Sequence, residues 1–152
     1  MPNIQTHRAS TTDVDFIVEA NVAMATETED LGLNRNTLEA GVRYMLAHPE
    51  EGQYLIATLD DKPVGTLMTT FEWSDWRNGR FWWIQSVYVL ASARRRGVYR
   101  AMHDAVRQLA ARDEQACGIR LYVEQENAVA QQTYQNIGMH ETHYRLYEEE
   151  FS

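Results

Sequence analysis

The hydrophobic pattern of the chain changes its period across one short segment. Residues 81–90 are aromatic and β-branched, which is typical of a strand. From residue 98 onward apolar side chains return at helical spacing, at Val98, Met102, Ala105 and Leu109. Only a short arginine-rich loop ending in Gly97 separates the two patterns. A strand that passes so abruptly into a helix predicts a mixed α/β fold.

Other segments extend this prediction along the chain. Thr11 or Thr12 can cap a first helix with Phe16, Ile17, Ala20 and Met24 near one face. Further helices are expected over residues 36–47, from 97 to near Cys117-Gly118, and from Asn127 through Ile137. Strands are expected over residues 4–9, 53–59, 64–71, 81–90, 119–124 and 139–148. The expected order is β-α-α-β-β-β-α-β-α-β.

Length and composition narrow the class of protein. A chain of 152 residues with 44% apolar and 24% charged residues predicts a single folded domain over residues 1–152. Without an apolar signal segment or membrane-length run, we expect a cytoplasmic protein with no membrane partner. The single cysteine, Cys117, is interpreted as structural. A net charge of -8 argues against nucleic-acid binding; it favours a cationic acceptor such as an amine, or simply solubility.

The loop before the third helix has the chemistry of an anion site. A helix start leaves backbone N–H groups without intrahelical partners, and the helix dipole adds positive potential there. Gly97 removes a Cβ where a phosphate would approach the backbone, and four arginines lie between Arg94 and Arg100. The pattern indicates a pyrophosphate site, with a solvated basic turn as the alternative. Neither Gly-x-Gly-x-x-Gly nor a Walker A loop occurs.

A second polar constellation lies between Glu124 and Met139. Asn127 and Tyr134 are two helical turns apart, so they lie on roughly one face of the predicted helix. A tyrosine there can bury its ring and keep its hydroxyl on a polar feature. The alternatives are a simple helix cap for Asn127 and a packed aromatic ring for Tyr134.

Together the two segments resemble the GNAT N-acetyltransferase superfamily. Arg94 and Gly97 are in register with its signature Arg/Gln-x-x-Gly-x-Gly/Ala, and residues 127–139 are similar to its Asn…Ala…Tyr…Gly-Met/Phe ending. The resemblance covers about residues 53–139. It implies a mixed, mostly antiparallel central sheet flanked by helices, with strands splayed at the cofactor site. It also implies transfer of an acetyl group from acetyl-CoA to a primary amine of a small molecule or a protein.

The resemblance assigns roles to individual residues. Backbone groups of residues 87–89 would hold the acetyl carbonyl, and amides of residues 95–100 would hold the pyrophosphate. Tyr134 would protonate the leaving thiolate. The implied cofactor-binding residues are Val87, Tyr88, Val89, Arg94, Arg95, Arg96, Gly97, Val98, Tyr99, Arg100, Asn127 and Tyr134. Tyr99 replaces the last small residue of the signature, so its ring must turn away from the phosphates.

The catalytic base and the acceptor pocket are less defined. Residues 81–90 contain no carboxylate, so we expect Glu72 to act as the base, in an apolar setting between Phe71 and Trp73. Glu124 and a water chain to solvent are the alternatives. Trp73, Trp83 and Gln85 are the candidate acceptor-binding residues, and residues 23–36 form a candidate acceptor loop.

Other functions were weighed against this one. No histidine pattern indicates a metal site, and the implied reaction needs none. A non-catalytic CoA-binding or acyl-CoA-binding domain of the same fold is the main alternative. A nucleic-acid contact through the arginine cluster conflicts with the overall acidity. A homodimer is left open by the exposed aromatic residues.

Overall fold

The computed structural model describes residues 3–151 and contains one five-stranded sheet with helices around it. The strands are β1 (Ile4–Arg8), β2 (Gly52–Leu59), β3 (Lys62–Ser74), β4 (Gly79–Val89) and β5 (Ala116–Arg120). The helices are α1 (Val14–Glu29), α2 (Arg35–Ala47), α3 (Val98–Ala111) and α4 (Ala128–Asn136). By their contacts the residues form two compact units, Met1–Leu121 and Tyr122–Ser152. The first unit contains the whole sheet.

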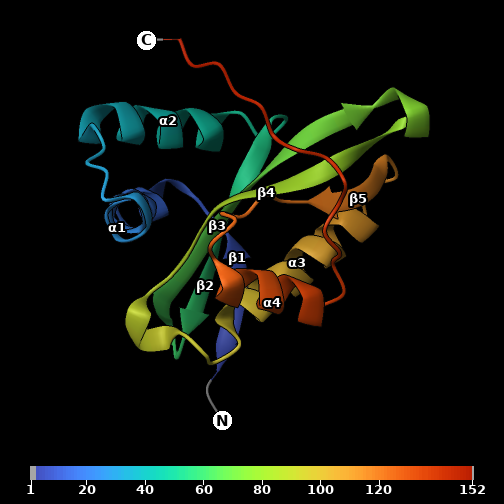
Figure 1. Cartoon of the computed structure of the whole chain (residues 1–152). Coiled ribbons are helices and arrows are strands. Elements are labelled where there is room, and N and C mark those ends of the chain that lie inside the picture. Colours follow the sequence, from blue (N-terminus) through green and yellow to red (C-terminus); the bar gives the residue numbers. More distant parts are fainter. Residues whose placement is uncertain (1–2, 152) are drawn as a thin grey trace. The chain divides into compact units, whose positions relative to one another are not determined.

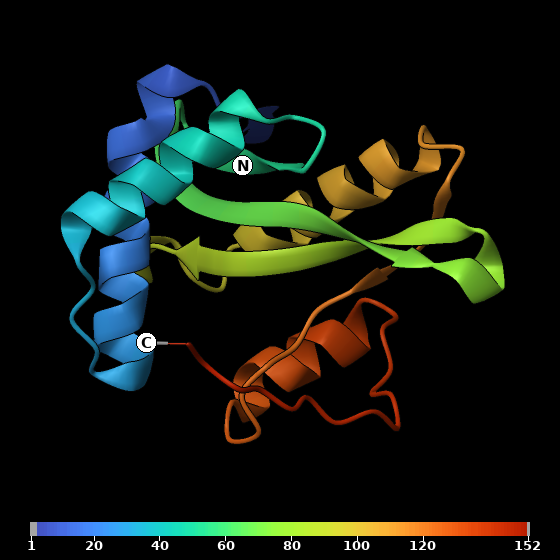
Figure 2. The same ribbon diagram turned by 90° about the horizontal axis from the view of Figure 1, so that it is seen from above.

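The strands follow the chain order across the sheet. Neighbours β1 to β4 pair antiparallel, and β5 joins β4 in parallel (Figure 1). Asp60 and Asp61 both have left-handed backbone conformations, which suit the two-residue turn that joins β2 to β3. The expected mixed, mostly antiparallel sheet flanked by helices is confirmed. Toward residues 74–79, β3 and β4 extend beyond the end of β2, and β5 pairs there with β4 from Arg80 to Trp83 (Figure 2).

Each face of the sheet has its own apolar core. On one face α1 and α2 pack through Ile17 and Val42 against Ile56 and its neighbours. On the other face α3 packs through Met102 and Val106 against Leu67 and its neighbours. A Cβ at Gly65 would lie 3.0 Å from Val98 Cγ1, so glycine lets β3 approach the start of α3 closely.

Two helix starts follow local capping chemistry. The side chain of Asn34 accepts a hydrogen bond from Thr37 N at 3.1 Å and caps α2. Before α1, Ser10 rather than Thr11 or Thr12 caps the short turn that leads into the helix, and its backbone N–H donates to Asp13 at 2.9 Å. Residues Thr11–Asp13 form a short 3-10 turn, and the α-helix proper begins at Val14.

The end of α3 was predicted wrongly. The helix stops at Ala111, and Cys117-Gly118 lies inside β5, which begins before the predicted residue 119. Asp113 decides this boundary. Its carboxylate accepts hydrogen bonds from Arg80 and Trp82 of β4 and from Gln115 N, which turns the chain back toward the sheet. β5 also ends at Arg120, so Glu124 lies outside any strand.

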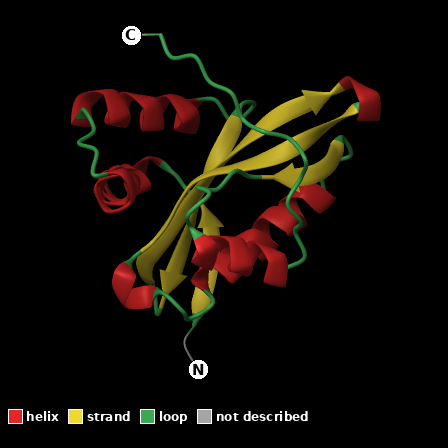
Figure 3. Ribbon diagram, in the orientation of Figure 1, coloured by secondary structure: helices red, strands yellow, loops and turns green. Residues whose placement is uncertain are grey.

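The last predicted strand does not form. Within the described chain, residues 139–148 adopt neither helix nor strand (Figure 3). Apolar side chains there are exposed, among them Tyr144, Leu146 and Tyr147. A strand is stable only where a neighbouring strand supplies backbone partners, and this segment pairs with no strand of the described chain.

Candidate functional site

The open edge of β4 is the first component of the site. β5 pairs with β4 only from Arg80 to Trp83, so the edge from Ile84 to Val89 has no partner strand within residues 3–151. On the other edge the register with β3 shifts, because Thr66 faces Tyr88 while Met68 faces Gln85. One β3 residue therefore opposes two β4 residues, which makes a bulge. Ser86 in this bulge has a left-handed φ of 52°.

This geometry leaves residues 87–89 on an open strand edge that follows a bulge. A bulge takes one residue out of the ladder and redirects the strand that follows it. Backbone groups on the open edge can then bind a ligand, because no strand competes for them. Sequence reasoning identified the segment but missed Ser86. A left-handed serine within a strong strand pattern has no signal in a single sequence.

The loop after β4 provides the second component. Arg95 and Gly97 both have left-handed conformations, with φ of 64° and 83°. α3 then begins, and its first intrahelical bond runs from Ala101 N to Gly97 O at 3.0 Å. The preceding N–H groups of the first turn therefore have no intrahelical acceptor. A Cβ at Gly97 would meet no atom within 4 Å, so the space in front of this helix start is open.

The four arginines of this loop divide into two groups. Arg94 donates through its Nη2 to Glu27 of α1 at 2.9 Å and through its Nε to Val89 O at 2.9 Å. Arg95, Arg96 and Arg100 are exposed, and no carboxylate of the described chain pairs with them. The positive charge that remains for an anion therefore comes from these three residues rather than from Arg94.

Tyr99 lies along α3 rather than across the loop. Its hydroxyl is 3.0 Å from His103 Nδ1 one turn further on, and the two ring centroids are 5.6 Å apart. The ring also packs against the core beneath α3. Its backbone N–H stays at the helix start. The bulky side chain is therefore accommodated at the position where the signature has a small residue.

His103 gives the protein a predicted pH dependence of stability. Burial, with a smaller contribution from the charge of Arg107, lowers the pKa of His103 to about 4. Between pH 6.5 and 4 the unfolded chain therefore binds the proton more readily, and stability falls as the pH falls. Full protonation costs up to about 3 kcal/mol at this site. We expect His103→Gln to be destabilised at pH 7 and the gap from wild type to narrow toward pH 4.5.

Chemical denaturation at several pH values measures this effect. The same exchange at exposed His140 is the control and should leave a gap that does not change with pH. A pH-independent gap for His103→Gln would show that the histidine does not carry the linkage.

Glu72 does not lie in the apolar setting that the sequence suggested. Its side chain is 44% exposed and accepts a hydrogen bond from Arg120 Nη1 at 2.7 Å. It pairs across β3 and β4 with Phe81. Phe81 is five residues from Ser86, or about 16 Å along a strand. Its neighbours Phe71 and Trp73 point to the other side of the strand, because successive side chains alternate.

One of the three candidate acceptor residues lines a cavity of about 430 Å³. Trp73 lines it, and Gln85 Nε2 donates at 2.6 Å to the hydroxyl of Thr70, which also lines it. Trp83 stands opposite Thr70 in the β3–β4 register. The remaining lining residues are Met45, Glu50, Glu51, Phe71 and Arg80. In the register, the lining residue Thr70 faces Trp83, three residues from Ser86, whereas the lining residue Arg80 lies six residues from Ser86, about 20 Å along a strand.

Asn127 and Tyr134 belong to the second unit, which is described by itself. Asn127 caps α4, with its side-chain oxygen accepting from Ala130 N at 3.1 Å. Gly138 has the left-handed φ of 101° expected after the helix. Burial raises the pKa of Tyr134 above its ordinary value. Glu124 is exposed, and its carbonyl accepts from Asn127 N.

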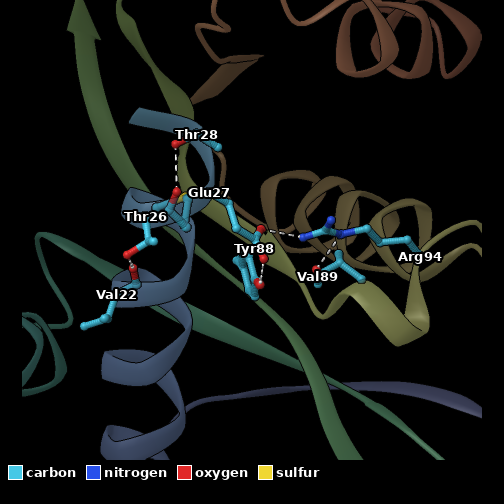
Figure 4. A network of polar contacts seen from close by, with 8 residues as sticks. Val22, Thr26, Glu27, Thr28, Tyr88, Val89 and Arg94 are labelled. Carbon is cyan, nitrogen blue, oxygen red and sulfur yellow. Dashed lines mark hydrogen bonds and ion pairs between the residues drawn. The ribbon is translucent and has the colours of Figure 1, made fainter. Parts of the chain in front are cut away.

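One contact of the site has no counterpart in the sequence analysis. Glu27 of α1 binds both Tyr88 and Arg94, although it lies more than sixty residues earlier in the chain (Figure 4).

Within residues 3–151, no group of histidine, cysteine or acidic side chains could hold a metal ion. In the same residues, every helix is too short or too polar to cross a membrane.

Comparisons with known proteins place this geometry in a family. The model of the acetyltransferase (GNAT) family matches residues 19–139. A possible acetyltransferase from Clostridium difficile 630 is 41% identical, with a TM-score of 0.89 and 98% of each chain covered. No curated protein matches the chain significantly. The chain therefore belongs to the GNAT family of acetyltransferases.

Two more distant structures share the fold. A predicted acetyltransferase with acetyl-CoA from Clostridium acetobutylicum is 18% identical, with a TM-score of 0.78 over 97% of this chain and 96% of that one. AAC(6')-Iy in complex with the bisubstrate analogue CoA-S-monomethyl-acetylneamine is 15% identical, with a TM-score of 0.80 over 99% of each chain.

Proposed function

We propose that this protein binds acetyl-CoA and transfers its acetyl group to a primary amine of a small molecule or a protein. The observation that carries the proposal is the open edge of β4 beyond Trp83, followed by the exposed start of α3. The family membership and the two related structures with CoA derivatives support the same cofactor. The proposal takes residues 1–152 as one acetyltransferase domain.

The residues fit the cofactor by their donor chemistry. The first-turn N–H groups of α3 and the arginines Arg95, Arg96 and Arg100 would hold the pyrophosphate. Backbone groups of Val87 to Val89 would bind the pantetheine arm and the thioester carbonyl. Asn127 would contact the pantetheine arm. The open space at Gly97 is what a phosphate needs to reach the backbone.

The reaction follows from these placements. A neutral amine attacks the thioester carbonyl, a C–N bond forms and the C–S bond breaks. A backbone N–H on the edge of β4 stabilises the negative charge that develops on the carbonyl oxygen. Tyr134 gives its proton to the leaving thiolate; its raised pKa keeps the phenol protonated at neutral pH. The proton of the amine passes to water. Glu72 would accept it from water, because its carboxylate is too far from the bulge to take the proton directly.

The cavity beside β4 would receive the acceptor. Trp73 offers an aromatic face for a cation, and the carboxylates of Glu50 and Glu51 add negative charge. Gln85 donates a hydrogen bond to the lining residue Thr70 and directly precedes the bulge, so it could orient an acceptor there. A non-catalytic acyl-CoA-binding domain is the second candidate, favoured by the lack of a carboxylate within β4.

Calorimetry with acetyl-CoA, free CoA and ATP tests the proposal. We expect acetyl-CoA to bind with micromolar affinity and ATP to bind much more weakly, because ATP lacks the pantetheine arm that the edge of β4 would hold. A screen of amines for release of free thiol then identifies the acceptor. If no binding is detected at millimolar acetyl-CoA, the proposal is wrong. Binding without turnover on any amine would favour the non-catalytic candidate.

A further inference from the structure

Glu27 joins three parts of the first unit through one carboxylate. It stands in the last turns of α1, and its Oε1 accepts the hydroxyl of Tyr88 at 2.8 Å. Its Oε2 accepts Arg94 Nη2 at 2.9 Å (Figure 4). Tyr88 belongs to the open end of β4, and Arg94 begins the loop that leads to α3. The carboxylate therefore bridges the strand edge and the loop.

Arg94 makes this bridge rigid. Its Nε donates to Val89 O at 2.9 Å, and its guanidinium lies 5.4 Å from the centre of the Tyr88 ring. A planar guanidinium with its two sides engaged in this way has few alternative orientations. The last residue of β4 and the first arginine of the loop are therefore held together, with Glu27 fixing the guanidinium from outside.

The charges explain why Glu27 needs this partner. The C-terminal end of a helix carries negative potential, and the last turn of α1 contains no basic residue. A carboxylate there is unfavourable unless a cation from another element approaches it. Hydrogen bonds from Arg94 and Tyr88 lower the pKa of Glu27, so it remains charged. In return Arg94 is neutralised and contributes little charge to an anion at Gly97.

We propose that Glu27 is a positioning residue for acetyl-CoA, which through Tyr88 and Arg94 fixes the open edge of β4 relative to the phosphate loop. The inference rests on the proposed function, because it assigns Glu27 to the same site. It predicts that Arg94 serves the cofactor through its contact with Glu27 rather than through a phosphate. If Glu27 instead kept Arg94 away from the phosphates, removing the charge of Glu27 would increase the affinity for acetyl-CoA.

Calorimetric titration of acetyl-CoA into folded variants tests this inference. We expect Glu27→Gln to raise the Kd by about tenfold, because two hydrogen bonds to a charged acceptor are weakened. Glu29→Gln is the matched control: it removes the same charge from an exposed residue of the same helix and should leave the Kd unchanged. The double variant Glu27→Gln/Arg94→Gln should have a Kd at most about twofold higher than that of Glu27→Gln alone, because both substitutions remove the same contact.

The outcomes separate this inference from the function on which it rests. No binding of acetyl-CoA by the wild type would overturn both. If the wild type binds acetyl-CoA and Glu27→Gln has the same or a lower Kd, only the positioning role is overturned. A merely structural role would lower the unfolding temperature and leave the Kd of the folded variant unchanged. Tyr88→Phe, which removes a single hydroxyl, gives the same test in a milder form if Glu27→Gln does not fold.

Discussion

Replacing Tyr134 by phenylalanine is expected to lower kcat by about a hundredfold, because general acid catalysis by one positioned group contributes at least that factor. The affinity for acetyl-CoA should stay nearly unchanged, since the ring that packs in the protein is retained. Without the phenol the thiolate must take its proton from water, and breaking the C–S bond becomes harder. Steady-state kinetics with the amine found by the thiol-release screen gives kcat, and calorimetry gives the affinity.

The pH profile adds an independent check on Tyr134. Because burial raises its pKa, the phenol stays protonated through the neutral and mildly alkaline range. The kcat of the wild type should therefore show no loss from this group at neutral and mildly alkaline pH. Tyr147→Phe is the matched control, because Tyr147 is a highly exposed phenol of the same unit. Equal kcat values for Tyr134→Phe and the control would remove Tyr134 from the mechanism.

Replacing Gly97 by glutamate is expected to weaken acetyl-CoA binding by about a hundredfold. A carboxylate about 5 Å from a phosphate repels it by about 3 kcal/mol at an effective dielectric constant of 20. That energy corresponds to about two factors of ten in Kd. Calorimetric titration measures the effect directly.

A size-matched variant isolates the charge at this position. Gly97→Gln has nearly the same side chain and the same unfavourable left-handed backbone, with φ of 83°, but no charge. Since a Cβ there meets no atom within 4 Å, the glutamine variant should fold and lose less affinity than the glutamate variant. Equal affinities of Gly97→Glu and wild type would contradict the placement of the pyrophosphate at this loop.

The local features of the site were predictable from the residues. The period change after residue 97 located α3, and the space that a Cβ of Gly97 would occupy is open, with no atom within 4 Å. Asn127 and Gly138 mark the two ends of α4 by capping chemistry that needs no distant partner. The family resemblance followed from these same short segments and is confirmed by the family match.

Errors arose where a boundary depends on a distant partner. Helical spacing continues past Ala111, yet Asp113 ends α3 because Arg80 and Trp82 hold its carboxylate. Residues 139–148 were expected to form a strand, yet they pair with no strand of the described chain. Glu72 was expected in an apolar setting, but Arg120 pairs with it at the surface.

The sequence by itself determined the mixed fold, the starts of α3 and α4 and the strand–loop–helix segment of the candidate cofactor site, because periodicity, capping and glycine conformations act over a few residues. Only the tertiary structure decided the bulge at Ser86, the cavity beside Trp73 and the bridge from Glu27 to Arg94. These features depend on which segments the sheet brings together. Contacts between residues so far apart are selected by packing of the whole chain, and no local pattern encodes them.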